Sequence, residues 1–206
     1  GPKDGMIRTE SDMAWVKAMI ADGYKFNGVT KVAKDQLWYG DLIYADANGD
    51  GNYGDTNDMN FTGTSTQPRY NFGFNLSAAY KGFDFYMLWA GSAGFDLYWN
   101  HSSYNGTRTE NGFGISQRVA DDHYFYDPEN PSDSRTNITA KYPRITDQTQ
   151  RDNAASSVFW KYKGDYVKLK NIQIGYTIPV KWTRKFMVEK LRFYFSGENL
   201  LTITDY

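Results

Sequence analysis

The sequence of 206 residues predicts an all-β fold of long antiparallel strands with long loops, as in part of a large transmembrane β-barrel. Two observations predict it. Residues 68–91 and 158–206 alternate apolar and polar side chains over stretches long enough to cross a bilayer. Residues 100–157, which lie between them, are polar and aromatic-rich without periodicity, and such a long connection is rare in a compact domain. We therefore expect two long hairpins joined by a long loop.

The first hairpin occupies residues 68–91. Apolar residues take every second position from Tyr70 to Tyr80, and the pattern changes phase across Lys81 and Gly82. A two-residue turn at that point sets the register. The expected pairs on the apolar face are Tyr80 with Phe83, Ala78 with Phe85, Leu76 with Met87, and Phe74 with Trp89. Strands of about 10 residues tilted by about 40° rise about 25 Å, which is the height of the apolar band on a membrane barrel.

The second hairpin lies within residues 158–206. Ile172, Ile174 and Tyr176 alternate with polar residues or glycine until Pro179 ends the run, because proline cannot continue a ladder. Residues 180–189 form a basic connection, and alternation resumes at Leu191, Phe193 and Phe195. The run to residue 206 ends without a closing element, so we interpret the chain as a fragment of a longer protein.

Composition excludes several classes of function. The formal net charge of −1 gives no reason to expect nucleic acid as a partner. The absence of cysteine excludes disulfides and thiol catalysis. No run of about 18 apolar residues predicts a transmembrane helix, but barrel strands are only half apolar and escape that test. Aromatic residues reach 17%, which suits the aromatic girdles of barrels.

One helix is expected, over residues 11–23. Ser11 is the candidate N-cap, and Gly23 is placed to end the helix. Met13, Val16 and Met19 recur at helical spacing and predict the buried face. Residues 23–40 suggest no more than one strand and a loop, and residues 95–99 extend the second strand of the first hairpin.

Residues 40–61 contain a candidate calcium loop. Asp46, Asn48 and Asp50, followed by Gly51, match the opening D-x-N-x-D-G of such loops, in which alternating oxygen ligands converge on Ca²⁺. The twelfth position, which is normally acidic, is Asn57, so the closing ligand must come from a neighbour. The candidate ligands are Asp46, Asn48, Asp50, Asn52, Asp55 and Asp58. The alternative is a polar turn without metal, because Asn, Asp and Gly favour turns anyway.

Aromatic side chains in and beside the long loop are candidates for stacking on sugar rings or packing against a partner protein. We select Tyr98, Trp99, Tyr104 and Tyr124. The alternative for each is ordinary packing within the loop. His101 and His123 lack the spacing of a metal pair and are interpreted as ordinary loop residues. No two of the acidic residues of this loop have a spacing that indicates a glycosidase, so we expect no enzyme.

The connections of a barrel alternate between its two sides. Lys81-Gly82 and residues 180–189 therefore lie on one side, and the calcium-like loop and residues 100–157 on the other. Because barrels have short periplasmic turns and long extracellular loops, the second pair is expected outside the cell.

Four segments also resemble a known family. They are GDLIYADANGDG (residues 40–51), QPRYNFGFNLSAAYKGFDF (67–85), DYVKLKNIQIGYTIP (165–179) and SGENLLTITDY (196–206). In this order and spacing they are similar to the last strands, and the loop before them, of SusC/RagA-type TonB-linked outer-membrane transporters. The family's D-x-N-G-D-G loop matches Asp46, Asn48, Gly49, Asp50 and Gly51.

This resemblance implies the C-terminal strands of a barrel of about 22 strands in the outer membrane, closed by an internal plug. It implies import of glycan or peptide fragments, with a SusD-like surface lipoprotein as lid, the TonB complex acting through the plug, and outer-membrane lipid around the barrel. Residues 1–66 would be an extracellular loop region with the helix and the calcium-like loop, and residues 67–206 the C-terminal strands with their long loop. The plug, TonB box, signal sequence and last strand are expected outside this fragment.

One other function fits the same features. A soluble, calcium-stabilised β-sandwich that binds carbohydrate would share the metal loop and the aromatic residues. It would bury the face of Phe72, Phe74, Met87 and Trp89 in a core, whereas a barrel presents that face to lipid. The surroundings of these rings therefore discriminate between the two.

Overall fold

The computed structural model describes residues 1–98, 114–146, 153 and 155–205. The chain divides into two units. The loop unit comprises Gly1–Thr62 and Trp99–Trp160, and the sheet unit comprises Gly63–Tyr98 and Lys161–Tyr206. The described residues of the long stretch at 100–157, which we assigned to the barrel portion of the chain, thus group with the N-terminal segment.

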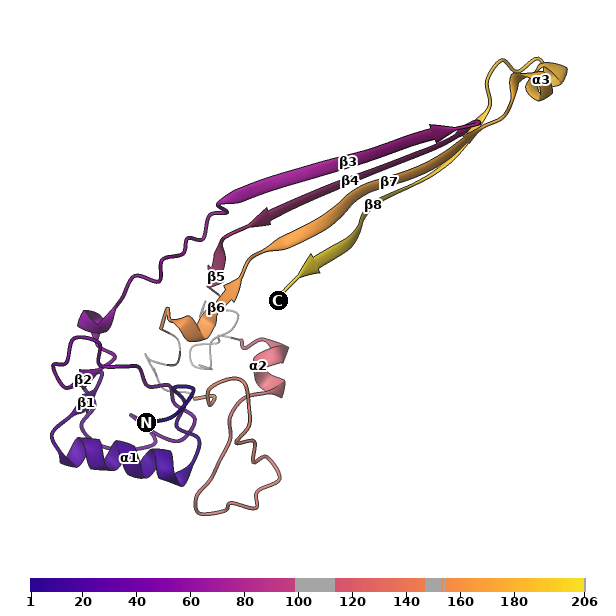
Figure 1. Ribbon diagram of the computed structural model, residues 1–206. Coiled ribbons are helices and arrows are strands. Elements are labelled where there is room, and N and C mark those ends of the chain that lie inside the picture. Colours follow the sequence, from indigo (N-terminus) through magenta and orange to yellow (C-terminus); the bar gives the residue numbers. More distant parts are fainter. Residues whose placement is uncertain (99–113, 147–152, 154, 206) are drawn as a thin grey trace. The chain divides into compact units, whose positions relative to one another are not determined.

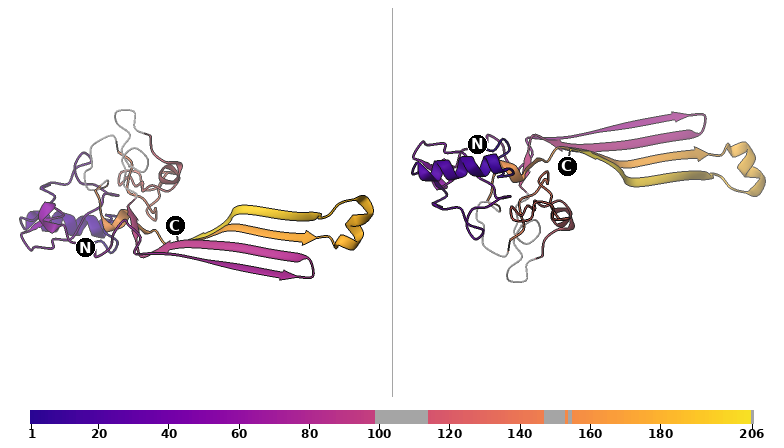
Figure 2. Two further views of the ribbon diagram at one scale, coloured as in Figure 1. Left: turned by 90° about the horizontal axis from the view of Figure 1, so that it is seen from above. Right: turned by 90° about the horizontal axis from the view of Figure 1, so that it is seen from below.

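The sheet unit is built on four long antiparallel strands in the order β3-β4-β7-β8 (Figure 1). Their bounds are β3 Tyr70–Tyr80, β4 Phe83–Ala93, β7 Tyr166–Thr177 and β8 Arg192–Thr204. Figure 2 shows them side by side in one curved layer. Both predicted hairpins are therefore present, and they pair with each other through β4 and β7.

The register of the first hairpin is confirmed at all four predicted pairs. Lys81 and Gly82 both have positive φ, 47° and 89°, as a two-residue turn that matches the strand twist requires. Thr177 of β7 donates its N–H to the carbonyl of Gly82 at 2.8 Å. A Cβ on Gly82 would lie 2.8 Å from the Thr177 carbonyl oxygen, so only glycine fits there.

The apolar face continues across all four strands in register. The row nearest the Lys81-Gly82 turn is wholly aromatic: Tyr80, Phe83, Tyr176 and Phe193. The rows beyond it are Ala78–Phe85–Ile174–Phe195, Leu76–Met87–Ile172–Gly197, Phe74–Trp89–Leu169–Leu201 and Phe72–Gly91–Val167–Ile203. None of the five rows contains a charged residue.

A β-bulge at Lys170 keeps this face apolar. The register shifts between Leu169 and Asn171, so that Lys170 has no register partner on β4 or β8. Asn199 and Leu200 of β8 are left out of the register at the same place. Without the bulge, the alternation of Ile172 and Ile174 would bring Lys170 onto the apolar face. With it, Leu169 takes that place, as expected of a bulge that re-aims side chains.

Exposure of the rings decides between barrel and sandwich. Within this unit Phe74 is 53% exposed, Ile174 49% and Phe193 62%. Trp89 is half-buried and stacks on Phe74 with ring centroids 6.1 Å apart. The other sheet among the described residues of this unit has only two short strands, and it leaves these side chains exposed. A sandwich would bury these side chains, so that alternative does not describe the sheet unit.

The opposite face carries an ion pair that crosses three strands. Arg192 of β8 donates to Asp84 of β4, with Nε 3.0 Å from Oδ2. Gly175 of β7 lies between them, and a Cβ there would be 2.5 Å from the Arg192 guanidinium and 2.6 Å from the Asp84 carboxylate. Glycine is therefore what allows the pair to bridge β7.

Short elements complete the sheet unit. β5 (Asp96–Tyr98) pairs with β6 (Lys161–Lys163), and α3 (Val180–Thr183) with the 3₁₀ turn η4 (Arg184–Phe186) joins β7 to β8. The expectation that residues 95–99 extend β4 was wrong. Gly94, with φ of 79°, interrupts the strand, and β5 forms a sheet of its own.

The loop unit contains the predicted helix, α1 (Glu10–Ala21). Its N-cap is Thr9, not Ser11 as predicted: the Thr9 hydroxyl accepts from Asp12 N, and the Asp12 carboxylate accepts from Thr9 N at 2.9 Å. This reciprocal capping box needs an acid three residues after the cap, and Ser11 is followed at that spacing by Ala14. None of the described helices of either unit is long and apolar enough to span a membrane.

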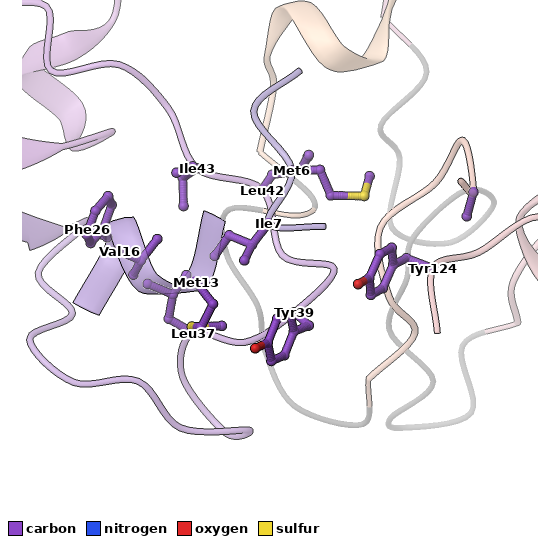
Figure 3. Packing of buried hydrophobic residues seen from close by; sticks show 11 residues of the cluster. Met6, Ile7, Met13, Val16, Phe26, Leu37, Tyr39, Leu42, Ile43 and Tyr124 are labelled. Carbon is purple, nitrogen blue, oxygen red and sulfur yellow. The ribbon is translucent and has the colours of Figure 1, made fainter. Parts of the chain in front are cut away.

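The core of the loop unit draws on both of its chain segments. Met13 and Val16 of α1 face Phe26 and Ile7 in a cluster that also includes Tyr124 (Figure 3). Around it lie short elements: β1 (Lys25–Phe26) paired in parallel with β2 (Asn52–Tyr53), the 3₁₀ turns η1 (Thr56–Asp58) and η3 (Val158–Trp160), and α2 (Gln117–Asp121).

A buried ion pair joins the two segments. Asp41, 1% exposed, receives Arg144 Nε at 2.6 Å and Nη2 at 2.9 Å, and the amide of Asn153 at 2.9 Å. Burial raises the pKa of Asp41, while the bonds from Arg144, Asn153 and the Trp38 N–H act in the opposite direction. The carboxylate thus depends on partners about a hundred residues away in the sequence.

We expect Arg144→Met to destabilise the loop unit by about 3–5 kcal/mol, because it leaves Asp41 buried and unpaired. The matched control is Arg135→Met, which removes the ion pair of Asp133 with a guanidinium that is 70% exposed and costs at most about 1 kcal/mol. Thermal unfolding of the intact protein followed by near-UV circular dichroism measures both. Equal effects of the two substitutions would show that Asp41 does not need its cation.

In the sheet unit, Gly175→Ala is expected to cost about 1–3 kcal/mol, because its methyl group displaces the Asp84–Arg192 pair. Gly114→Ala is the control, since a Cβ there meets nothing within 4 Å. The resistance of the folded protein to heating in detergent, read by its electrophoretic mobility, reports the difference. An unchanged Gly175→Ala protein contradicts the steric argument.

Candidate functional site

The calcium-like loop is held by its own carboxylates. Asp46 accepts three backbone N–H groups: Gly49 at 2.6 Å and Asp50 at 3.2 Å on Oδ1, and Gly51 at 2.9 Å on Oδ2. Gly49 and Gly51 have positive φ, which lets the backbone turn round the Asp46 side chain. Asp46 therefore stabilises a turn through its side chain, as the turn preference of Asp and Asn predicts.

Asn48, Asp50 and Asn52 continue the same pattern along the loop. The Asn48 side-chain oxygen accepts from Asp50 N at 2.9 Å, and Asp50 Oδ1 accepts from Asn52 N at 2.8 Å. The Asn48 amide also donates to Asp50 Oδ2 at 2.9 Å. Two carboxylates and an amide oxygen thus lie within five residues, the oxygen-only ligand chemistry that Ca²⁺ takes.

Asp58 closes the loop. Its Oδ1 accepts from Ala47 N at 2.6 Å and its Oδ2 from Gly54 N at 2.7 Å, so its side chain returns to the start of the loop. Although burial acts to raise it, the pKa of Asp58 is lowered overall by the N–H groups of Ala47, Gly54 and Asn48. The carboxylate is therefore held ionised.

Asp55 has a different place. It caps the turn η1 by accepting from Asn57 N at 2.7 Å, and it receives the Asn52 amide at 2.9 Å. All six predicted ligands thus belong to one hydrogen-bonded loop. Among the described residues, however, no three His, Cys, Asp or Glu side chains gather into a metal-binding group. A calcium ion would need the Asn48 oxygen, backbone carbonyls and water beside Asp46 and Asp50.

The four aromatic candidates differ in what the structure says of them. Trp99 and Tyr104, with His101, lie outside the described residues. Tyr98 ends β5 opposite Lys161 and is half-buried. The stacking role for Tyr124 was wrong: its ring is 1% exposed in the core, and its hydroxyl donates to the Arg8 carbonyl at 2.6 Å.

A hollow of about 250 Å³ in the loop unit was not found from the sequence. Trp38, Tyr39 and Tyr126 line it together with Lys34, whose Nζ lies 5.8 Å from the Trp38 ring centroid. Tyr39 meets Tyr126 edge to face at 5.1 Å, and burial, aided by Glu10, raises the pKa of the Tyr39 phenol. In the sequence, the two neighbouring aromatic residues Trp38 and Tyr39 could have pointed to this hollow. The hollow is smaller than most ligand pockets.

His123 borders the same hollow and keeps the ordinary role expected of it. Its Nδ1 lies 2.8 Å from the Ala120 carbonyl oxygen, within its own chain segment. Tyr124 also borders the hollow but exposes too little of its ring to stack on a sugar.

Comparison with known proteins relates the whole arrangement to one family. The chain is 32% identical over 193 residues to TonB-dependent receptor P3 of Formosa agariphila and 29% identical over 195 residues to TonB-dependent receptor P26 of the same organism. These matches cover 89% and 91% of the chain. The chain is homologous to a segment of TonB-dependent receptors. It spans only 17% and 18% of the length of these two receptors, and no family model matches it.

Solved structures agree on the fold of this receptor segment. The RagAB peptide importer in its open-open state matches with a TM-score of 0.54 at 21% identity, covering 81% of this chain and 17% of that one. Its closed-closed state matches with a TM-score of 0.51, also at 21% identity, over 81% of this chain and 18% of that one. The predicted antiparallel barrel strands and the outer-membrane localisation of TonB-dependent receptors are thereby confirmed.

Proposed function

We propose that this segment forms part of the wall and of the extracellular surface of a TonB-dependent importer of glycan or peptide fragments. The apolar face of five uncharged rows carries the proposal. Hydrocarbon tails solvate such a face without cost, whereas water does not. A tilted strand of 11 residues, the length of β3, rises about 28 Å, enough for the apolar band. We assign no catalytic step to the segment.

A SusD-like lipoprotein is the proposed partner of the loop unit. The sequence resemblance supports it, as does the likeness to RagAB, which is described as a peptide importer. Peptide and glycan fragments are the two proposed classes of cargo, and Tyr98, Trp99 and Tyr104 are the proposed contacts to cargo or lid. Coupling to TonB would act through a plug supplied by another part of the receptor.

Uptake by cells tests the transport proposal. Cells that produce the full-length receptor are expected to take up labelled glycan or peptide fragments that a deletion strain does not, and the uptake should disappear when the partner lipoprotein is deleted. Equal uptake by producing and deletion strains, for every fragment in a panel of both classes, would contradict the proposal.

The lipid-facing assignment is tested by one matched pair on β8. Phe195→Arg places a charge on the apolar face and is expected to cost up to about 2–4 kcal/mol of barrel stability, depending on its depth. Ser196→Arg, the next residue on the opposite face, is expected to cost little. The folded fraction of the full-length receptor in lipid vesicles under urea measures both. Equal losses would mean that the two faces meet the same solvent.

We also propose that the loop of residues 46–58 binds calcium. Asp46, Asn48 and Asp50 would supply side-chain oxygens, with Asp58 closing the loop and Asn52 and Asp55 at its rim. The convergence of Asp58 on the N–H groups of Ala47 and Gly54 supports a preformed loop. When bound, the ion would neutralise charge within a cluster of four aspartates, which is a structural role.

Calcium is expected to raise the melting temperature of the full-length receptor, because an ion that binds only the folded state stabilises it by mass action. Asp50→Ala should abolish the increase. Asp133→Ala removes a carboxylate elsewhere in the loop unit, outside residues 46–58, and should leave the increase intact. Differential scanning calorimetry with and without chelator measures the effect, and an unchanged melting temperature in chelator contradicts the site.

A further inference from the structure

The connection between β7 and β8, residues 180–191, is a compact knob rather than a simple turn. α3 and η4 follow one another, and the backbone closes on itself through Trp182 N to Pro179 O at 2.9 Å and Val188 N to Thr183 O at 3.2 Å. Thr183 is only 4% exposed. The backbone conformation of the knob is therefore held by its own hydrogen bonds.

Those outward side chains are apolar and cationic together. Trp182 is 57% exposed, Phe186 78% and Met187 95%. Lys181, Arg184 and Lys185 lie beside them in the sequence and are exposed as well. Large apolar residues at this exposure are unfavourable in water, and a cluster of them beside cations is the pattern of helices that lie in a membrane interface.

The knob begins where the apolar face of the sheet ends. Gly82, in the turn between β3 and β4, accepts a hydrogen bond from the N–H of Thr177. The knob starts three residues after Thr177 in the chain. The aromatic row of Tyr80, Phe83, Tyr176 and Phe193 runs across the four strands just before this level. Figure 1 shows α3 beyond the ends of β7 and β8, on the side of the β3–β4 turn.

This position gives the knob the depth of lipid headgroups. Aromatic rows mark the boundary between hydrocarbon and headgroup on barrels, so residues just beyond such a row meet phosphates. Cationic side chains there are attracted by anionic lipid, and Trp and Phe suit the boundary between polar and apolar layers.

We propose that residues 180–191 are an interfacial anchor that binds anionic phospholipid on the periplasmic leaflet. Trp182, Phe186 and Met187 insert between lipid headgroups, and Lys181, Arg184 and Lys185 contact lipid phosphates. The inference rests on the proposed function, because only a barrel whose short turns face the periplasm brings this end to that leaflet.

Depth-dependent quenching in lipid bilayers tests the anchor. An environment-sensitive fluorophore is attached to Met187→Cys in a full-length receptor without other reactive cysteines, reconstituted in nanodiscs with or without phosphatidylglycerol. Nitroxides on the headgroup should quench it more than nitroxides deep in the acyl chain. The quenching should strengthen with phosphatidylglycerol and be lost in high salt and in the variant Lys181→Gln, Arg184→Gln, Lys185→Gln.

Two further labels separate this inference from the proposed function. Phe195→Cys, on the apolar face, should be quenched by the deep nitroxide, and Phe61→Cys, 93% exposed in the loop unit, by neither. If Phe195→Cys is quenched and Met187→Cys is not, the anchor is refuted while the barrel stands. If Met187→Cys is quenched equally with and without phosphatidylglycerol, and equally in the glutamine variant, the preference for anionic lipid is refuted. If neither label is quenched, the anchor is refuted, and so is the proposal that the apolar face of the sheet contacts lipid.

Discussion

The structure depends on the antiparallel backbone ladder that joins β3, β4, β7 and β8. In hydrocarbon no water is present to satisfy an unpaired N–H or C=O group, so strands can cross a membrane only when every such group is paired to a neighbour. The ladder fixes the register, and the register decides which side chains share a face. Five uncharged rows on one face and an ion pair on the other are consequences of that pairing.

Departures from regular geometry serve the same constraint. The bulge at Lys170 changes the phase of β7 where its sequence would otherwise turn a lysine toward the apolar side. Gly175 leaves room for Asp84 and Arg192 to meet across β7 on the polar side. Gly91 lies under the ring of Phe72, where a side chain would collide with it. The bulge thus keeps a charged side chain off the apolar face, and the two glycines leave space for large side chains of the neighbouring strands.

The sequence predicted what local rules determine. A two-residue turn and period-2 alternation sufficed for the register of the first hairpin, because both are set within a few residues. The phase change at Lys170 was missed, since a bulge depends on the neighbouring strand. Thr9 was missed because its capping box relies on Asp12 rather than the commoner Glu. The burial of Tyr124 and of Asp41 could not be predicted for another reason. Their hydrogen-bond partners, Arg8 and Arg144, lie over a hundred residues away in the sequence.

The loop of residues 46–58 is held in shape by hydrogen bonds within the chain. Backbone N–H groups donate to the carboxylates of Asp46 and Asp58 and hold the loop in its turn. Its edge is tied to the core, because Lys25 N bonds Gly51 O and Phe26 packs against Tyr53 at 5.3 Å. A cation that relieves the repulsion among its aspartates would therefore stabilise the packing of α1 as well as the loop. In this geometry the proposed ion binding would be energetically coupled to the loop-unit core through β1 and β2.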